Sequence, residues 1–104
     1  MREGLKDDIS KVVEGELAAA IENFPMYHSA HEGYAVLKEE VEEAEQELEV
    51  IKARLTNLWS CTKMNVVPKE TINDLAKFAQ LLACEATQIA AVAQKFVKSS
   101  EGWK

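Results

Sequence analysis

The sequence is poor in glycine and proline, the two residues that most often interrupt regular secondary structure. Its 104 residues include only four glycines and two prolines. No segment alternates β-branched and polar residues as a half-buried strand does, whereas apolar residues recur at helical spacings of three and four almost everywhere. These absences predict an all-α fold: a single domain, residues 1–104, built as an elongated bundle of three main helices.

Cysteine and histidine are also scarce. Cys61 and Cys84 lie far apart and form no C-x-x-C pair, which favours two free thiols in a reducing compartment over a disulfide. With His28 and His31 as the only histidines, a structural zinc site has few soft ligands. His31 does not open an H-E-x-x-H motif, because Ala35 stands at the second histidine position, so a zinc protease is not supported.

Basic residues are also fewer than acidic ones. The net charge is −6, and no cluster of lysine and arginine is present to displace counterions from duplex nucleic acid or to bind an anionic membrane. No apolar run approaches the ~18–20 residues that span a bilayer. The first residues lack the apolar core of a signal peptide, and no glycine-rich phosphate loop occurs. We therefore expect a cytoplasmic protein without duplex nucleic-acid or membrane partners.

Local signals define the helix ends. Pro25 ends the first helix, because the residue before a proline is pushed out of the α region. Ser29 and Glu32 form an S-x-x-E capping box at the start of the second. Pro68 suits the first turn of the third. The predicted helices span about residues 5–24, 30–62 and 68–98.

The second helix carries one apolar line at nearly heptad spacing, typical of the seam of a bundle or coiled coil. Its members are Tyr34, Leu37, Val41, Ala44, Leu48, Ile51, Leu55 and Leu58. The third helix is apolar on more than one face around Ala90, Ala91 and Val92. This surplus predicts a second copy of the chain that completes the bundle, as a homodimer or a higher oligomer.

Glutamate is the residue that is abundant. Seven of the eleven positions from Glu39 to Glu49 are glutamate, and a solvated acidic face is the simplest interpretation. The spacing allows a second one, because Glu40 and Glu43 lie one turn apart beside the apolar line. Carboxylates placed there would be partly buried and would need a cation. Mg²⁺ fits, since it prefers oxygen ligands.

Glu85 stands alone in the uncharged stretch 78–94, with Gln88 one turn further along the same face. A single glutamate on an alanine-rich packed helix is costly unless it is paired. The alternative is that Glu85 simply points into solvent.

These residues resemble those of a known family. The segment Leu37–Glu43, LKEEVEE, resembles the L-x-E-E-x-x-E motif of the all-α MazG-like nucleotide pyrophosphohydrolases. Ser29–Tyr34 is similar to the stretch that opens that helix in small phage and bacterial members. Glu85–Ala91 falls where the family carries an E-x-x-D pair. The resemblance covers roughly residues 24–96.

The resemblance implies an activity: hydrolysis of a nucleoside triphosphate or a related nucleotide to the monophosphate and pyrophosphate. Members commonly form dimers or larger assemblies. By position, the resemblance implies catalytic Glu39 and Glu40, with Glu39 as the base for the attacking water or as a neighbouring ligand. Mg²⁺ or Mn²⁺ would be bound by Glu40, Glu43, Glu85 and Gln88. His31 and Lys95 are candidate substrate contacts.

Gln88 departs from the family pattern, which has aspartate at this position. An amide carbonyl can bind Mg²⁺ but brings no charge, so the site is either tuned differently or weakened to a vestige. The alternative function is a non-catalytic helical oligomer that acts as a binding or interaction protein. Two features favour this alternative: Gln88 and the heptad line of the second helix.

Overall fold

Three helices make up nearly all of the chain in a computed structural model that describes residues 1–103. Helix α1 spans Glu3–Asn23, α2 spans Ala30–Thr62 and α3 spans Lys69–Ser100. Residues 1–103 contain no strand. The predicted all-α, three-helix architecture is confirmed, and the helix ends lie within two residues of the ranges expected from the sequence.

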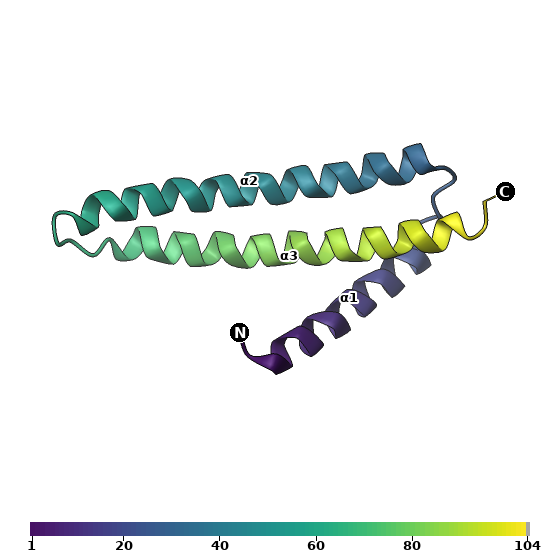
Figure 1. Ribbon diagram of the computed structural model, residues 1–104, viewed down its shortest axis with the longest axis horizontal. Helices are drawn as coiled ribbons and strands as arrows, with labels where there is room; N and C mark the ends of the chain where they lie inside the picture. Colours follow the sequence, from purple (N-terminus) through teal and green to yellow (C-terminus); the bar gives the residue numbers. More distant parts are fainter. Residues whose placement is uncertain (104) are drawn as a thin grey trace.

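Two of the helices form a long hairpin, and the remaining helix packs against one of them at an angle (Figure 1). Helices α2 and α3 run antiparallel and side by side, whereas α1 packs against α3 alone and diverges from it toward the N-terminus. The molecule measures 62 × 30 × 20 Å. Within residues 1–103, none of the helices combines the length and apolar character needed to cross a bilayer.

The predicted capping box begins α2. The Ser29 hydroxyl oxygen accepts a hydrogen bond from the Glu32 amide at 3.1 Å, and a Glu32 carboxylate oxygen accepts one from the His28 amide at 3.1 Å. This exchange satisfies backbone donors that have no partner inside the helix. At the other end, Asn65 adopts a positive φ of 56°. The chain then turns back, and Pro68 precedes the first residue of α3.

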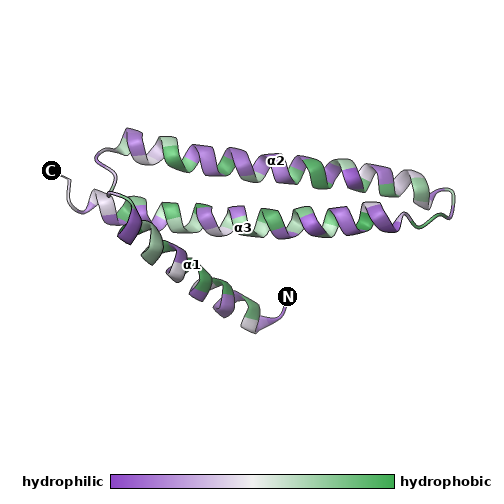
Figure 2. Cartoon of the chain, turned by 180° about the vertical axis from the view of Figure 1, so that it is seen from behind, coloured by the Kyte–Doolittle hydropathy of each residue, from purple (hydrophilic) through white to green (hydrophobic). Residues whose placement is uncertain are grey.

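The apolar line of α2 divides into two rows. Leu37, Ala44, Ile51 and Leu58 are half-buried, and α3 is the only helix that packs against α2. Tyr34, Val41, Leu48 and Leu55 are 37–62% exposed. Within a single chain, the expected seam is therefore covered along one row only. Figure 2 shows hydrophobic and hydrophilic residues mixed along α2. One neighbouring helix covers one row, and the second row stays at the surface.

The apolar surplus of α3 is covered within the chain. Ala91 and Val92 are 1% and 7% exposed. Val92 shares a pocket with Ala20 at the end of α1, and Ala90 shares a groove with Val13. These residues therefore provide no argument for a second copy, and the predicted homo-oligomer stays a prediction.

The connector between α1 and α2, residues 24–29, is hydrogen-bonded to residues at the C-terminal end of α3 and just beyond it. The Ser99 hydroxyl accepts a hydrogen bond from the Tyr27 amide at 3.0 Å, and the Trp103 indole donates to the Tyr27 carbonyl at 2.9 Å. The ring of Phe96 lies between the two aromatic rings, 6.4 Å from Tyr27 and 6.0 Å from Trp103. Gly33 packs so closely that a Cβ there would lie 2.6 Å from Phe96. This junction fixes where α2 starts relative to α3.

Candidate metal centre and adjoining pocket

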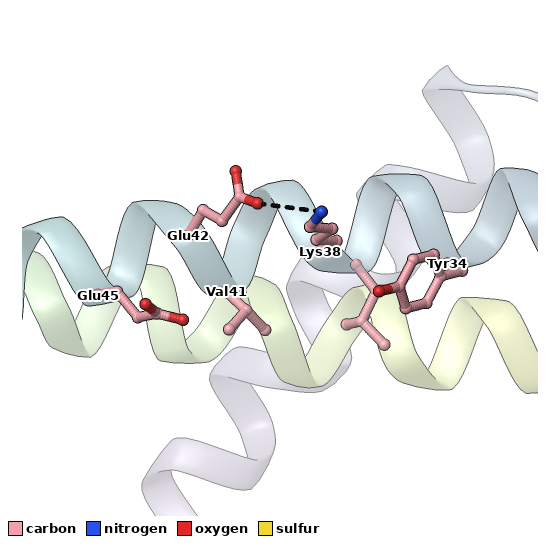
Figure 3. Close-up of a pocket in the computed structure, with 6 residues that line it drawn as sticks. Tyr34, Lys38, Val41, Glu42 and Glu45 are labelled. Carbon is pink, nitrogen blue, oxygen red and sulfur yellow. Dashed lines mark ion pairs between the residues drawn. The ribbon is translucent and has the colours of Figure 1, made fainter.

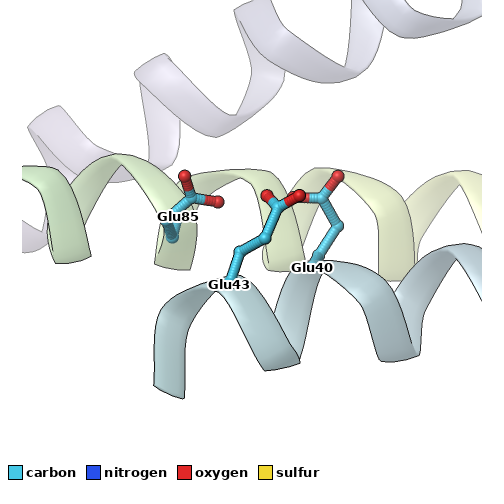
Figure 4. A group of neighbouring side chains, drawn as sticks. All are labelled: Glu40, Glu43 and Glu85. Carbon is cyan, nitrogen blue, oxygen red and sulfur yellow. The ribbon is translucent and has the colours of Figure 1, made fainter. Parts of the chain in front are cut away.

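Three glutamates converge between α2 and α3. Glu40 and Glu43 lie one turn apart on α2, and Glu85 projects toward them from α3 (Figure 4). One carboxylate oxygen from each residue lies within 4.8 Å of the other two. Glu40 and Glu85 are half-buried. The structure thus brings together the three acids that the sequence singled out, although Glu85 lies more than forty residues along the chain from Glu40 and Glu43.

Their proximity changes the acidity of two of them. Burial raises the pKa of Glu40, and the charges of Glu43 and Glu39 raise it further. Burial also raises the pKa of Glu85, followed by a hydrogen bond with Glu43 and by the charges of Glu43, Glu40 and Glu47. Each of these causes disfavours the ionised carboxylate. The cluster therefore favours any species that neutralises it, a proton or a cation.

Glu47, seven residues after Glu40 on α2, adds a fourth carboxylate. Its Oε2 atom is buried and has no hydrogen-bond partner within residues 1–103. Its charge acts on Glu85, which places it beside the cluster. A buried carboxylate oxygen without a donor is costly. The heptad step from Glu40 to Glu47 is the signal that could have identified it.

Within residues 1–103, no basic side chain forms an ion pair with these acids. Among residues 1–103, the ion pairs of α2 lie elsewhere: Lys38–Glu42 at 3.7 Å, Lys52–Glu49 at 3.3 Å, and Arg54–Asp74 between α2 and α3 at 3.4 Å. The hairpin thus neutralises charge where Arg54 meets Asp74, but not at the glutamate cluster.

The donor set suits a hard divalent cation. Every candidate ligand is a carboxylate oxygen, and no histidine or cysteine joins the group. Mg²⁺ and Mn²⁺ prefer such ligands, whereas Zn²⁺ prefers nitrogen and sulfur. The orphaned oxygen of Glu47 is consistent with the same chemistry. The residues present therefore fit the metal that the MazG-like resemblance implies.

Two further residues of the expected site have other surroundings. Glu39 is exposed and acts on the cluster through its charge on Glu40. The Gln88 amide nitrogen donates a 2.8 Å hydrogen bond to Glu16 of α1. Glu16 was missed from the sequence, because nothing local to α1 reveals which residue of α3 it meets.

A pocket of about 470 Å³ adjoins the cluster and is shared by all three helices and the connector. Glu40 and Gln88 line it on the side of the acids, and Lys95 lines it from α3. Tyr27 also lines it: burial raises the pKa of its phenol, and the charges of Glu40 and Glu32 raise it further. Lys95, a substrate contact expected from the sequence, thus shares this pocket with Glu40.

His31 lies elsewhere. It lines a separate shallow hollow with Ala30 and Tyr34, whereas His28 and Glu32 line the pocket beside Glu40. No local sequence pattern favours His28 over His31 as a pocket residue, because the position of His28 depends on how the connector packs against the end of α3.

A third hollow, of about 370 Å³, lies on the outer face of α2 (Figure 3). Tyr34, Val41 and Glu45 border it, and the Lys38–Glu42 ion pair crosses one side. Its acidic groups do not converge on the Glu40 cluster. It belongs to the exposed apolar row of α2 and is no part of the candidate metal centre.

Comparisons of the chain with protein-family models, curated proteins and solved structures found no match. The MazG-like resemblance therefore depends on the motifs alone.

Proposed function

We propose that this protein is a divalent-metal-dependent nucleotide pyrophosphohydrolase. The observation that carries the proposal is the convergence of Glu40, Glu43 and Glu85 within 4.8 Å, from two helices and without a neutralising basic residue. A like-charged cluster between packed helices is unfavourable unless a proton or a cation neutralises it. The order of the motifs along the chain agrees with the MazG-like pattern.

The carboxylates of Glu40, Glu43 and Glu85 would hold Mg²⁺ or Mn²⁺, with Glu47 beside them. When bound, the ion would neutralise phosphate charge and orient water for attack. The water oxygen attacks the α-phosphorus, the bond from that phosphorus to the bridging oxygen breaks, and pyrophosphate leaves. Glu39 takes the proton of the attacking water. Its exposure allows that proton to pass on to solvent.

Gln88 limits the charge of the site. Its amide nitrogen donates to Glu16, and its uncharged carbonyl oxygen is the atom that could bind a cation. An aspartate in the same place would add a negative charge and hold the ion more tightly. We therefore expect weak metal binding, which makes the protein dependent on millimolar Mg²⁺.

The proposed assembly is a homodimer that covers the exposed row of α2. Tyr34, Val41, Leu48 and Leu55 repeat every seven residues on one face, the spacing at which two helices pair along their length. A second copy that presents the same row would bury it by two-fold symmetry.

The test is pyrophosphate release from a panel of ribo- and deoxyribonucleoside triphosphates with Mg²⁺ and with Mn²⁺. We expect release by the wild-type protein and its loss in Glu40→Gln. Glu45→Gln is the matched control, because Glu45 is exposed on the same helix and lies outside the cluster. The absence of release from every nucleotide would rule out the catalytic proposal.

The second candidate is a non-catalytic helical oligomer that binds a partner or a nucleotide. The exposed apolar row of α2 and the engagement of Gln88 by Glu16 favour it. The double variant Glu40→Gln, Glu43→Gln separates the two functions. If metal binding and the protein's effect in its host both survive that change, the acids are solvated surface and the second candidate holds.

A further inference from the structure

The pocket beside the glutamate cluster has two chemically different ends. Its volume of about 470 Å³ lies within the roughly 300–1,000 Å³ typical of small-molecule sites. Glu40 lies at the end that adjoins the acids. At the other end are the rings of Phe24 and Tyr27 with the side chain of Lys95.

Lys95 is the unusual group in this pocket. The residue is only 2% exposed, yet within residues 1–103 no carboxylate lies within ion-pair distance of it. Among the described residues its Nζ atom has one protein acceptor, the Ala20 carbonyl oxygen at 3.4 Å. An ammonium group carries three donors. Two of them are therefore available to an acceptor inside the pocket, and leaving them unused in a buried setting is costly.

Aromatic surfaces surround that ammonium group. Nζ lies 4.7 Å from the ring centre of Tyr27 and 5.9 Å from that of Phe24. Phe24 is 65% exposed, so one large apolar ring faces open space at the pocket. Flat rings beside a hydrogen-bond donor suit a planar heterocycle, because nucleobases stack on aromatic side chains.

A phosphate chain suits this end less well. The pocket is lined by the carboxylates of Glu32 and Glu40, and Lys95 and His28 are its only basic residues within 1–103. A polyanion placed beside Lys95 would find few positive charges and no cation to accompany it. The phosphates have a better place at the Glu40 end, where a cation would accompany them.

We propose that the pocket binds the base of the nucleotide, and that Lys95 donates to a carbonyl oxygen or ring nitrogen on the base edge. This inference rests on the proposed function and makes Lys95 a determinant of specificity. Guanine presents two adjacent acceptors, and uracil and thymine present a carbonyl. Adenine presents the ring nitrogen N7 beside an amino group, so it offers the ammonium one acceptor next to a competing donor. The pocket therefore prefers bases with a carbonyl over adenine.

The test measures binding of nucleoside 5′-monophosphates by titration calorimetry in the presence of Mg²⁺, so that it does not depend on turnover. The wild type should bind GMP about tenfold or more tightly than AMP, in line with the discrimination that a bidentate basic contact gives. Lys95→Met keeps the apolar stem and removes the donors, so the ratio should fall to near one. Lys98→Met is the matched control, since Lys98 is exposed on the same helix.

A second measurement does not require a variant. GMP should shift the Lys95 side-chain resonances of the wild-type protein, and inorganic phosphate should not. Phe24→Leu should weaken GMP and AMP alike, because stacking does not distinguish the bases. Equal affinity for GMP and AMP, a ratio that survives Lys95→Met, or an equal shift with phosphate would each overturn the inference.

The outcomes separate this inference from the function on which it rests. If triphosphates are hydrolysed but no Lys95-dependent preference exists, the function stands and the base pocket is refuted. If GMP is preferred through Lys95 but no triphosphate is cleaved, the pocket stands as a binding site and the catalytic proposal is refuted.

Discussion

Glu43→Gln is the substitution with the most informative expected result, because its effect should change sign with metal. Glu43 faces both other acids of the cluster, so the change removes two of the three close carboxylate pairs while keeping the shape of the side chain. In the absence of metal, removing like charges should stabilise the folded protein. In the presence of metal, removing a ligand should weaken the stabilisation that metal provides.

The size of the stabilisation expected without metal follows from the distance between the carboxylates. Two unit charges at 4.8 Å repel each other by about 0.9 kcal/mol in bulk water, and by more where the surroundings are less polar. Two such pairs give about 2 kcal/mol when all three carboxylates are ionised. For a domain of this size, each kcal/mol moves Tm by about 4–8 °C.

The size of the effect expected with metal follows from the amount by which metal binding stabilises the folded state. If the ion binds with a Kd of about 1 mM, then about 10 mM Mg²⁺ stabilises the folded wild type by about 1.4 kcal/mol. The variant should gain much less, because it has lost one of three charged ligands. The advantage of the variant should therefore shrink or vanish as Mg²⁺ is added.

The assay is thermal unfolding followed by circular dichroism at about pH 8, where the carboxylates are ionised, with and without Mg²⁺. Glu45→Gln controls for the loss of one surface charge, since neighbouring like charges on a helix cost only about 0.2–0.5 kcal/mol per pair; it should respond to Mg²⁺ as the wild type does. A Glu43→Gln protein that unfolds below the wild type without metal, or that gains equally from Mg²⁺, would refute the reasoning.

Three further predictions concern the pH dependence of the acid cluster, the packing at Gly33 and the exposed row of α2. Because Glu40 and Glu85 have folded-state pKa values raised above their ordinary 4.5, their contribution to stability is fully present below that pH and is lost as the pH rises through the raised values. Calorimetry should therefore show the metal-free protein losing stability above about pH 4.5, while the gain from Mg²⁺ grows with pH; the opposite trends would contradict the buried acid cluster. Gly33→Ala should lower the free energy of unfolding in urea by about 1–3 kcal/mol, because its Cβ would lie 2.6 Å from Phe96; a gain from the better helix propensity of alanine would show that the ring moves aside. Leu48→Glu should leave the helical content unchanged but reduce the mass seen by sedimentation to that of one chain; an unchanged oligomer would exclude the α2 row as its interface.

The helices themselves could be predicted because their ends depend on local chemistry. The Ser29–Glu32 box, Pro25 and Pro68 act over a few residues, and the structure shows each at or beside a helix end. The proximity of Glu40 and Glu85 could also be predicted from the sequence. Helical spacing put Glu40 beside the apolar line, and a short turn between two long helices forces them to pair antiparallel.

Two features could not be predicted in the same way. The heptad pattern of α2 records apolar spacing but not the number of neighbouring helices, so it gave one seam where the structure has a covered row and an exposed row. The pocket depends on the angle of α1 and on contacts such as Tyr27 with Ser99, which are 72 residues apart. No local pattern encodes a contact over that separation.

The placement of the acids also affects where the hairpin opens. Antiparallel helices usually exchange amide protons fastest at their ends, where fewest contacts hold them. Here the helix ends near the connector are held by aromatic packing and by the Ser99 and Trp103 hydrogen bonds, whereas repelling carboxylates lie well inside the pair. Without a cation, the segment around Glu43 and Glu85 should be the most frequently opened part of an otherwise regular hairpin. A bound cation would close that interior weak point and leave ordinary fraying at the termini.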